Sequence, residues 1–345
     1  MEDINHPDIR VLFEPKSIAV IGAAREQTKI GFKVVENIVT GGYRGCVYPI
    51  NPHGGEILGL KTFRTLEEVQ KPVDVATLVI PAKYVFEAVK SCAKKNVKYL
   101  SIISSGFSEI GNSEEEKRIV SYAREHDMRV LGPNIFGIYS APASLNATFA
   151  STGITPGRVA IITQSGALGI AMIGKTNVEK IGLSSIVSVG NKADVDEADL
   201  LEYLVDDGLT KIVLMYIEGV RSGERLINAV KKTTRKIPIV VIKSGRSERG
   251  AMAAASHTGS LAGSDEIFAA IMKQCGVLRA ESVDEAFNWC KFLANTAFPS
   301  GENTVIVTNG GGIGVMATDA CEKYGVRLYD DIGALKEAFS PVTPD

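Results

Sequence analysis

The sequence predicts an α/β protein built from more than one domain. Apolar, β-rich runs alternate with helical patterns over the first 150 residues, and the alternation restarts near residue 158 and again near residue 304. A length of 345 residues suits two to three domains. Strands that are apolar almost throughout and are separated by helices indicate parallel sheets that helices cover on both faces.

The first part is expected to span residues 1–145. Its strands are expected at Ser17–Ile21, Cys46–Ile50, Val75–Ile80, Tyr99–Ile103 and Arg129–Leu131. The clearest helical patterns cover Lys83–Lys94 and Glu114–Glu125. The segment Ala141–Pro156 is rich in Ala, Ser, Thr and Pro, and we interpret it as a linker.

The second part is expected over residues 146–298. Its strands are expected at Arg158–Thr163, Ser185–Val189, Ile212–Ile217 and Pro238–Ile242. Its helices are expected at Leu168–Ile181, Glu197–Asp207, Glu224–Lys232, Asp265–Lys273 and Val283–Ala294.

A third part is expected over residues 299–345, after the polar connection Phe298–Asn303. It reads as strand Thr304–Thr308, a glycine turn, helix Ile313–Tyr324 and short strand Val326–Leu328. One strand–helix–strand unit cannot bury both of its faces alone. It therefore either docks on the second part or is the start of a truncated third domain, and we favour truncation.

Composition excludes several classes of function. The net charge of −2 gives no electrostatic case for binding nucleic acid or an anionic membrane. No apolar run reaches the ~18 residues of a membrane span. The polar, acidic N-terminus does not resemble a signal peptide. Five scattered cysteines without a C-x-x-C pair suit reduced thiols in the cytoplasm better than disulfides or a metal site.

A glycine turn follows the first expected strand. It comprises Gly22, Ala23, Ala24 and Arg25, and Gly31 opens the next helix, so backbone N–H groups and a helix N-terminus can hold phosphate there. The G-x-G-x-x-G spacing of NAD sites is absent. The second strand also ends in Asn51-Pro52 rather than in Asp or Glu.

A different adenine-bearing ligand therefore fits this turn better than NAD, and coenzyme A is the natural candidate. Arg25 and Lys29 are candidates to contact its phosphates, although either alone is as readily a solvated basic side chain.

Two further helix starts have the composition of anion sites. Ser165 lacks the glycines that a nucleophile elbow needs two positions before and after the serine, because Thr163 and Ala167 occupy them. An N-capping serine at a helix that binds an anion explains Ser165-Gly166-Ala167 better. A second helix start of this kind is expected at Gly310, Gly311 and Gly312. Two such starts that converge on one histidine would hold phosphate between them.

That histidine is His257, which small residues flank on both sides. An exposed, mobile imidazole near anion sites can accept a phosphoryl group, whereas the alternative is a loop histidine without chemistry. Glu218 is expected at the carboxyl end of a parallel strand, where it could accept the imidazole N–H or simply face water. His6, His53 and His126 are expected to be structural or solvated, although the turn at His53 can approach the ligand of the first part.

These residues carry a resemblance to a known family. The chain resembles the α subunit, or α-like portion, of ADP-forming acyl-CoA (acetyl-CoA) synthetases, relatives of succinyl-CoA synthetase. The resemblance covers essentially the whole chain, and its most specific part is the string from Ser256 to Gly263. The supporting motifs are Ser17–Ala23, Pro49–Pro52, Gly132–Asn134, Gln164–Ala167 and Ile217–Gly219.

The resemblance implies a Rossmann-like CoA-binding domain, a flavodoxin-like domain of the succinyl-CoA-synthetase type with a phosphorylatable histidine, and the start of a further α/β ligase domain. The implied reaction is acyl-CoA + phosphate + ADP ⇌ organic acid + CoA + ATP. His257 would be phosphorylated from an acyl phosphate, and Glu218 would stabilise the phosphoimidazole. The segments at Ser165–Ala167 and Gly310–Gly312 would hold phosphate. CoA would contact residues around Gly22–Gly31, Asn51, Pro52, Ile80 and Pro81.

The acyl pocket is expected around Asn134–Tyr139, with Asn134 as the substrate residue. Family members often have cysteine where this chain has Ile135, so no thiol is assigned a role there. The resemblance also implies a separate ATP-grasp β subunit that supplies Mg and ADP or ATP, and hence a hetero-oligomer. No metal site is expected in this chain itself.

Two rival functions remain open at this point. A non-catalytic CoA-binding regulatory module would keep the fold without the chemistry, but the presence of both His257 and Glu218 weighs against it. An NAD-dependent oxidoreductase is disfavoured by the missing glycine fingerprint and the missing acidic residue.

Overall fold

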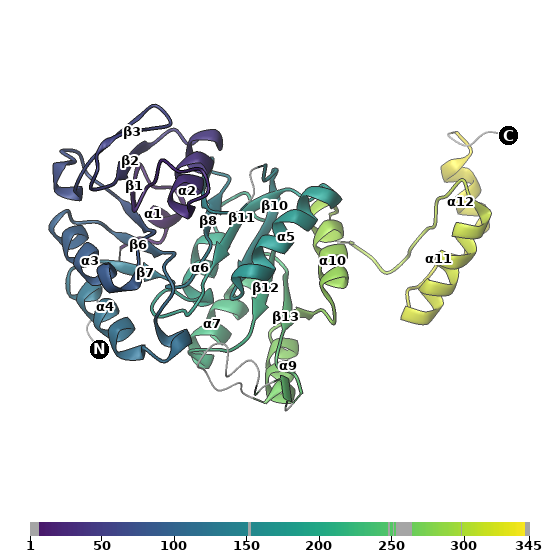
Figure 1. Ribbon diagram of the computed structural model, residues 1–345. Helices are drawn as coiled ribbons and strands as arrows, with labels where there is room; N and C mark the ends of the chain where they lie inside the picture. Colours follow the sequence, from purple (N-terminus) through teal and green to yellow (C-terminus); the bar gives the residue numbers. More distant parts are fainter. Residues whose placement is uncertain are drawn as a thin grey trace. The chain divides into compact units, whose positions relative to one another are not determined.

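The computed structural model describes residues 7–150, 153–247, 249–250, 252, 264–297 and 299–341. The chain divides into two compact units, Met1–Asn295 and Thr296–Asp345, which are described separately. The first unit holds two large sheets that lie side by side, coloured from purple to blue and from teal to green (Figure 1).

The first sheet is parallel throughout its described strands, in the order β2-β1-β5-β6-β7. Its members are β1 (Ser17–Ile21), β2 (Cys46–Ile50), β5 (Val75–Leu78), β6 (Tyr99–Ile102) and β7 (Arg129–Leu131). The chain runs outward from β1 to β2 and then returns to the other side of β1. This reversal places a topological switch point between β1 and β5, where ligands bind in open α/β sheets.

Helices cover both faces of this sheet, as its apolar strands predict. Apolar side chains of α2 (Ile30–Thr40) pack in one core, whereas those of α3 (Val85–Lys94) and α4 (Ser113–Glu125) pack in the other. The short elements that complete this part are α1 (Arg10–Phe13), the hairpin β3 (Gly55–Ile57) and β4 (Leu60–Thr62), and the 3₁₀ turns Leu66–Glu68, Ala82–Tyr84 and Ser108–Ile110.

The second sheet has the order β14-β13-β12-β10-β11-β8-β9 and is mixed. Its parallel members are β10 (Pro156–Thr163), β11 (Leu183–Ser188), β12 (Ile212–Ile217), β13 (Ile239–Lys243) and β14 (Leu278–Arg279). The antiparallel edge consists of β8 (Gly137–Ser140) and β9 (Leu145–Thr148).

Helices also cover each face of the second sheet. Side chains of α5 (Gly166–Glu179) and α10 (Val283–Asn295) share one core. Side chains of α6 (Glu197–Leu204), α7 (Gly223–Thr234) and α9 (Asp265–Gln274) pack in the other, which is continuous with the core beneath α2. One hydrophobic core therefore connects the two sheets.

The linker expected at Ala141–Pro156 is wrong in part, because β9 lies within it. Buried Asn37 on α2 explains how this polar segment becomes a strand. Its amide Nδ2 donates to the carbonyl oxygens of Thr148 (2.8 Å) and Ala150 (2.9 Å). These partners lie more than a hundred residues away along the chain, so local sequence carries no sign of them.

The second unit contains α11 (Gly311–Tyr324) and α12 (Ile332–Phe339). The strands expected at Thr304–Thr308 and Val326–Leu328 are wrong. Within the described part of this unit, the two segments share only the bridge between Thr304 and Leu328. Val307 is 75% exposed, so its β-branched side chain has no packed surface to stabilise a strand.

A buried ionic cluster fixes β7 against the loop before α6. The Asp194 carboxylate is fully buried and accepts hydrogen bonds from Arg129 Nε (2.8 Å), Arg124 Nη2 (2.5 Å) and the backbone N–H of Val130 (2.9 Å). Burial alone would raise the pKa of Asp194, but these hydrogen bonds and the charge of Arg129 lower it instead.

All five cysteines lie in the described ranges and are free thiols. Among the described residues, no helix has the length and apolar character that crossing a bilayer requires.

Candidate functional site: a cavity across strand ends and a second strand-end cluster

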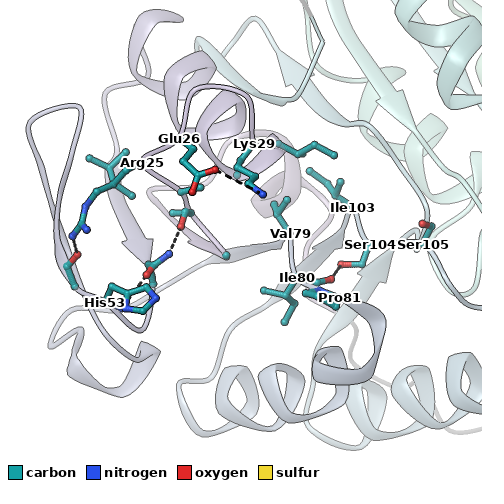
Figure 2. A pocket seen from close by; sticks show the side chains of 18 residues that line it. Arg25, Glu26, Lys29, His53, Val79, Ile80, Pro81, Ile103, Ser104 and Ser105 are labelled. Carbon is teal, nitrogen blue, oxygen red and sulfur yellow. Dashed lines mark hydrogen bonds and ion pairs between the residues drawn. The ribbon is translucent and has the colours of Figure 1, made fainter.

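A cavity of about 580 Å³ lies across the carboxyl ends of β2, β1, β5 and β6. We call it the strand-end cavity. Arg25 and His53 lie at one end, Ile80 and Pro81 near the middle, and Ser104 and Ser105 at the other end (Figure 2). The cavity thus occupies the switch point of the first sheet.

Two glycines let the backbone come together at the base of the cavity. Gly22 has φ +93°, in the region that favours glycine, and its N–H donates to Ile50 O at 3.1 Å. A Cβ on Gly31 would lie 2.0 Å from Gly22 O, so only glycine permits this approach. The N-terminus of α2 opens here, and no described side chain caps it. Its first N–H groups can therefore bind an anion.

Basic and polar side chains surround that helix start. Arg25 donates to the carbonyl oxygen of Gly54 and so holds the turn after β2. Lys29 Nζ lies 3.8 Å from Glu26 Oε2 in an exposed ion pair. The amide Nδ2 of Asn51 donates to Ala23 O at 2.7 Å, which ties the end of β2 to the glycine turn. Two cations and an open helix N-terminus make this end of the cavity suited to phosphate groups.

The structure brings nearly all of the sequence-predicted CoA residues together in this cavity. Pro52 follows Asn51 but is not among the described lining residues. His53, whose turn was expected to be able to approach the ligand, does line it. The predicted residues in the lining are Gly22, Ala23, Ala24, Arg25, Lys29, Gly31, Asn51, Ile80 and Pro81.

Sequence reasoning missed the far end of the cavity, at Ile103, Ser104 and Ser105. The signal was available, because these residues lie at or directly after the end of an expected strand and ligands gather at the carboxyl ends of strands. Ser104 Oγ donates to Ile80 O at 2.5 Å, which fixes the β5 and β6 ends to each other.

A second cluster forms at the carboxyl ends of β10 and β12, which pair side by side. Ser165 caps α5 as predicted, with its Oγ accepting the N–H of Leu168 at 3.3 Å. Glu218 directly follows β12, also as predicted, and is buried. Gln164 Oε1 accepts the N–H groups of Glu218 (2.8 Å) and Gly219 (3.1 Å). Gln164 therefore joins the start of α5 to the turn that carries Glu218.

Two buried lysines, both missed from the sequence, support the same turn. Lys243 Nζ donates to Glu218 O at 2.9 Å, and Lys192 Nζ donates to the carbonyl oxygen of Gly219 and to Glu197 Oε1. Burial lowers the pKa of Lys243. Burial also raises the pKa of Tyr216, and the Glu218 carboxylate beside its hydroxyl adds to that rise although Ser244 opposes it.

Three other predicted sites have different outcomes. Asn134 follows β7 and its N–H donates to Ser104 O at 3.0 Å, so it adjoins the far end of the strand-end cavity. Gly310 is the N-cap of α11, with Gly311 and Gly312 in its first turn, all in the second unit. His257 lies outside the described residues. The convergence of two helix starts on His257 stays a prediction.

Fold and site together define an α/β protein whose cavity across strand ends is suited to a phosphate-bearing ligand. Comparison with known proteins agrees with this class. A family model described as a CoA binding domain matches residues 16–141, and one described as a succinyl-CoA ligase like flavodoxin domain matches residues 156–293.

Relatives match along almost the whole chain. The α subunit of ADP-forming acetate–CoA ligase I of Pyrococcus furiosus is 53% identical over 95% of this chain and 72% of its own length. An ADP-forming acetate–CoA ligase of Methanocaldococcus jannaschii is 41% identical over 93% of this chain but only 45% of its own length. The chain belongs to the family of ADP-forming acetate–CoA ligase α subunits.

A solved structure shows the same fold. The dinucleotide-forming acetyl-coenzyme A synthetase 1 of Ca. Korarchaeum cryptofilum, in complex with phosphate and ADP, has a TM-score of 0.93 and 46% identity. The match covers 98% of this chain and 73% of that one.

Proposed function

We propose that this chain is the CoA-binding, histidine-phosphorylated subunit of an ADP-forming acyl-CoA ligase. The complete enzyme converts acyl-CoA, phosphate and ADP to an organic acid, CoA and ATP. The observation that carries the proposal is the strand-end cavity. There the uncapped N-terminus of α2, Arg25 and Lys29 lie around the close backbone contact between Gly22 and Gly31. The names of the relatives support the reaction, since they are ADP-forming acetate–CoA ligases.

The proposed chemistry on this chain has two steps. Phosphate attacks the thioester carbonyl, the C–S bond breaks, and CoA leaves as a thiolate while an acyl phosphate forms. An imidazole nitrogen of His257 then attacks the phosphorus of the acyl phosphate. The bond between that phosphorus and the acyl oxygen breaks, so the organic acid leaves as a carboxylate and the phosphoryl group stays on the ring.

The second cluster supplies what this transfer needs. The N-terminus of α5, with Ser165, Gly166 and Ala167, offers backbone donors to a phosphate, and oriented donors stabilise the charge-rich transition state of phosphoryl transfer. Glu218 lies on the adjacent strand end, where its carboxylate would accept the imidazole N–H and steady the phosphorylated ring. Gly310, Gly311 and Gly312 are proposed as the second phosphate-holding helix start.

The finer parts of the proposal concern partners and location. An ATP-grasp β subunit would supply Mg and ADP or ATP, so the working enzyme would be a hetero-oligomer in the cytoplasm. The relatives support a partner, because some are named as α subunits whereas others are single chains about twice as long as the matched region. Asn134 is proposed to contact the acyl group, and the names of the relatives favour acetate.

The test is phosphoryl labelling of the full chain together with its β subunit. Wild-type protein should acquire an acid-labile, base-stable label from acyl phosphate, and His257→Ala should acquire none. His126→Ala is the matched control, because His126 is exposed and its ring contacts the nearby Tyr122, through Nδ1 to Tyr122 O and by stacking on the Tyr122 ring. Label that persists in His257→Ala would overturn the assignment.

The regulatory alternative predicts a different result. A non-catalytic module would bind CoA in the strand-end cavity but take up no phosphoryl group, even with the β subunit present. Calorimetry with CoA and the labelling assay on the same sample separate the two functions.

A further inference from the structure

The far end of the strand-end cavity lies next to Asn134, a residue that a side chain from the second sheet holds in place. The cavity crosses the ends of β2, β1, β5 and β6 in that order, and β7 is the next strand. A long ligand with its phosphates at the Arg25 end therefore extends toward Ser104 (Figure 2). Asn134, which follows β7, is the next residue in that direction, because its N–H bonds the carbonyl oxygen of Ser104. This inference rests on the proposed function, in which that end carries the thioester.

Asn134 is held in an unusual conformation. Its φ is +63°, which few residues other than glycine adopt, although asparagine tolerates it better than most. Its backbone N–H donates to Ser104 O at 3.0 Å, and its side-chain Nδ2 donates to Asn191 Oδ1 at 3.3 Å. One side-chain bond thus ties Asn134 to the loop after β11, in the second sheet.

Asn191 has no freedom to turn its amide around. Its Nδ2 donates to Glu109 Oε2 at 2.6 Å and to Glu116 Oε2 at 2.8 Å. Ionised carboxylates only accept, so both N–H groups of Asn191 face them and its oxygen must face Asn134. Its backbone N–H also donates to Pro133 O at 3.0 Å.

The two carboxylates are themselves anchored on the loop that ends the cavity. Glu109 accepts the N–H groups of Gly106 and Phe107, and Glu116 accepts the Oγ (2.7 Å) and N–H (3.2 Å) of Ser108. Burial would raise the pKa of Glu109, but the bonds from Gly106 and Asn191 lower it, so it stays ionised. The chain from Ser104 through Asn134, Asn191 and Glu109 returns to the same loop, and we call it the Asn191 ring.

We infer that Asn191 is a positioning residue, which fixes Asn134 at the thioester end of the strand-end cavity. An asparagine amide has two N–H donors, and Asn191 takes one of those of Asn134. The other is the group that hydrogen-bonds the thioester or acyl oxygen. Because Asn191 comes from the second sheet, the alignment of the acyl group depends on the junction between the two sheets.

Removing the ring contact should lower catalysis without weakening CoA binding. Asn191→Ala should reduce kcat/KM for acyl-CoA about 10- to 100-fold, because small misplacements of a reacting group have effects of this size. The dissociation constant of CoA should change less than about twofold, since the phosphate end of the cavity is intact. Asn191→Ser keeps one donor but is too short to reach Asn134, and it serves if Asn191→Ala fails to fold.

A change of charge perturbs the Asn191 ring in a second way. Asn191→Asp places a third carboxylate against Glu109 and Glu116, and it should lower activity further than Asn191→Ala. Adding Glu109→Gln restores a donor opposite the new carboxylate and should recover part of the loss. Tyr203→Phe is the control, because it removes the 2.9 Å bond to Glu14 while leaving the Asn191 ring intact.

A double mutant tests whether Asn191 acts through Asn134. If it does, Asn191→Ala has no further effect on kcat/KM in an Asn134→Ala background. The inference would be overturned if the reductions in kcat/KM of the two single variants multiplied in the double variant. An Asn191→Ala variant with wild-type kcat/KM would overturn it as well.

A second readout does not depend on turnover. In protein labelled with ¹⁵N-asparagine, a thioether analogue of acyl-CoA should shift the Asn134 side-chain amide signal in wild type but not in Asn191→Ala. If the wild-type complex forms no ATP from acyl-CoA, the proposed function is wrong. If the Asn134 signal shifts equally in both proteins, the positioning role of Asn191 is wrong.

Discussion

Replacing Asp194 by asparagine should lower the free energy of unfolding by about 3–5 kcal/mol, the range for breaking a buried ion pair. The carboxylate is fully buried, with Arg124 on one oxygen and Arg129 and the N–H of Val130 on the other. An asparagine amide presents an N–H group on one side. Whichever way it turns, its N–H group therefore faces a donor, either the half-exposed Arg124 or the buried Arg129, which then keeps only the longer 3.3 Å contact with Asp199 among its described ion pairs.

Most of that magnitude comes from Arg129, whose side chain is 7% exposed. The side chain of Arg124 is 43% exposed, so solvent screens its share. The control is Asp206→Asn, which breaks an exposed pair with Lys236 and should leave the urea midpoint unchanged within error.

Urea unfolding at several pH values measures both the size and the sign of the effect. The folded-state pKa of Asp194 is lowered, so its stabilisation is fully present above the unfolded value of about 3.9 and is lost as the pH falls through the folded value. The difference between wild type and Asp194→Asn should be constant near neutral pH and shrink below about pH 4. A neutral-pH difference under about 1 kcal/mol would contradict a stabilising ion pair between Asp194 and Arg129.

Three further predictions concern the candidate sites. Gly31→Ala forces a Cβ against Gly22 O and should weaken CoA binding at least about tenfold by calorimetry, with a loss of about 1–3 kcal/mol in stability; unchanged binding would contradict the close approach. Arg25→Gln should raise the dissociation constant of CoA about fivefold at low salt and less at high salt, and a salt-independent effect would argue against phosphate contact. Glu218→Gln should slow phosphorylation of His257 about 10- to 100-fold in rapid-quench labelling, and a wild-type rate would remove Glu218 from the proposed site.

Local sequence predicted the elements whose residue pattern is itself local. β1 occupies Ser17–Ile21 as expected, because five residues with buried or partly buried side chains form a strand of the parallel core. The glycine turn at Gly22 and the helix after it are predictable for the same reason, since a positive φ and a close approach both require glycine. The N-cap at Ser165 likewise depends on a bond to a residue three positions away.

Elements that depend on distant partners escaped prediction. β9 reads as linker because Asn146 and Thr148 are polar, yet they bond each other at 2.7 Å and are buried. Thr304–Thr308 has strand composition but lacks a ladder among the described residues of its unit. Lys243 ends an otherwise apolar strand, and only the turn at Glu218 explains why an ammonium group is buried there.

Composition and short spacings were sufficient to predict the alternation of strands and helices and the glycine turn of the first sheet, and to select His257 and Glu218 as candidates. The folded structure was needed to show that β8 and β9 join the second sheet and that Asn191 reaches Asn134. Glu109 and Glu116 lie 82 and 75 residues from Asn191 along the chain. No local pattern records a contact at that separation, because folding alone brings the three side chains within hydrogen-bond distance.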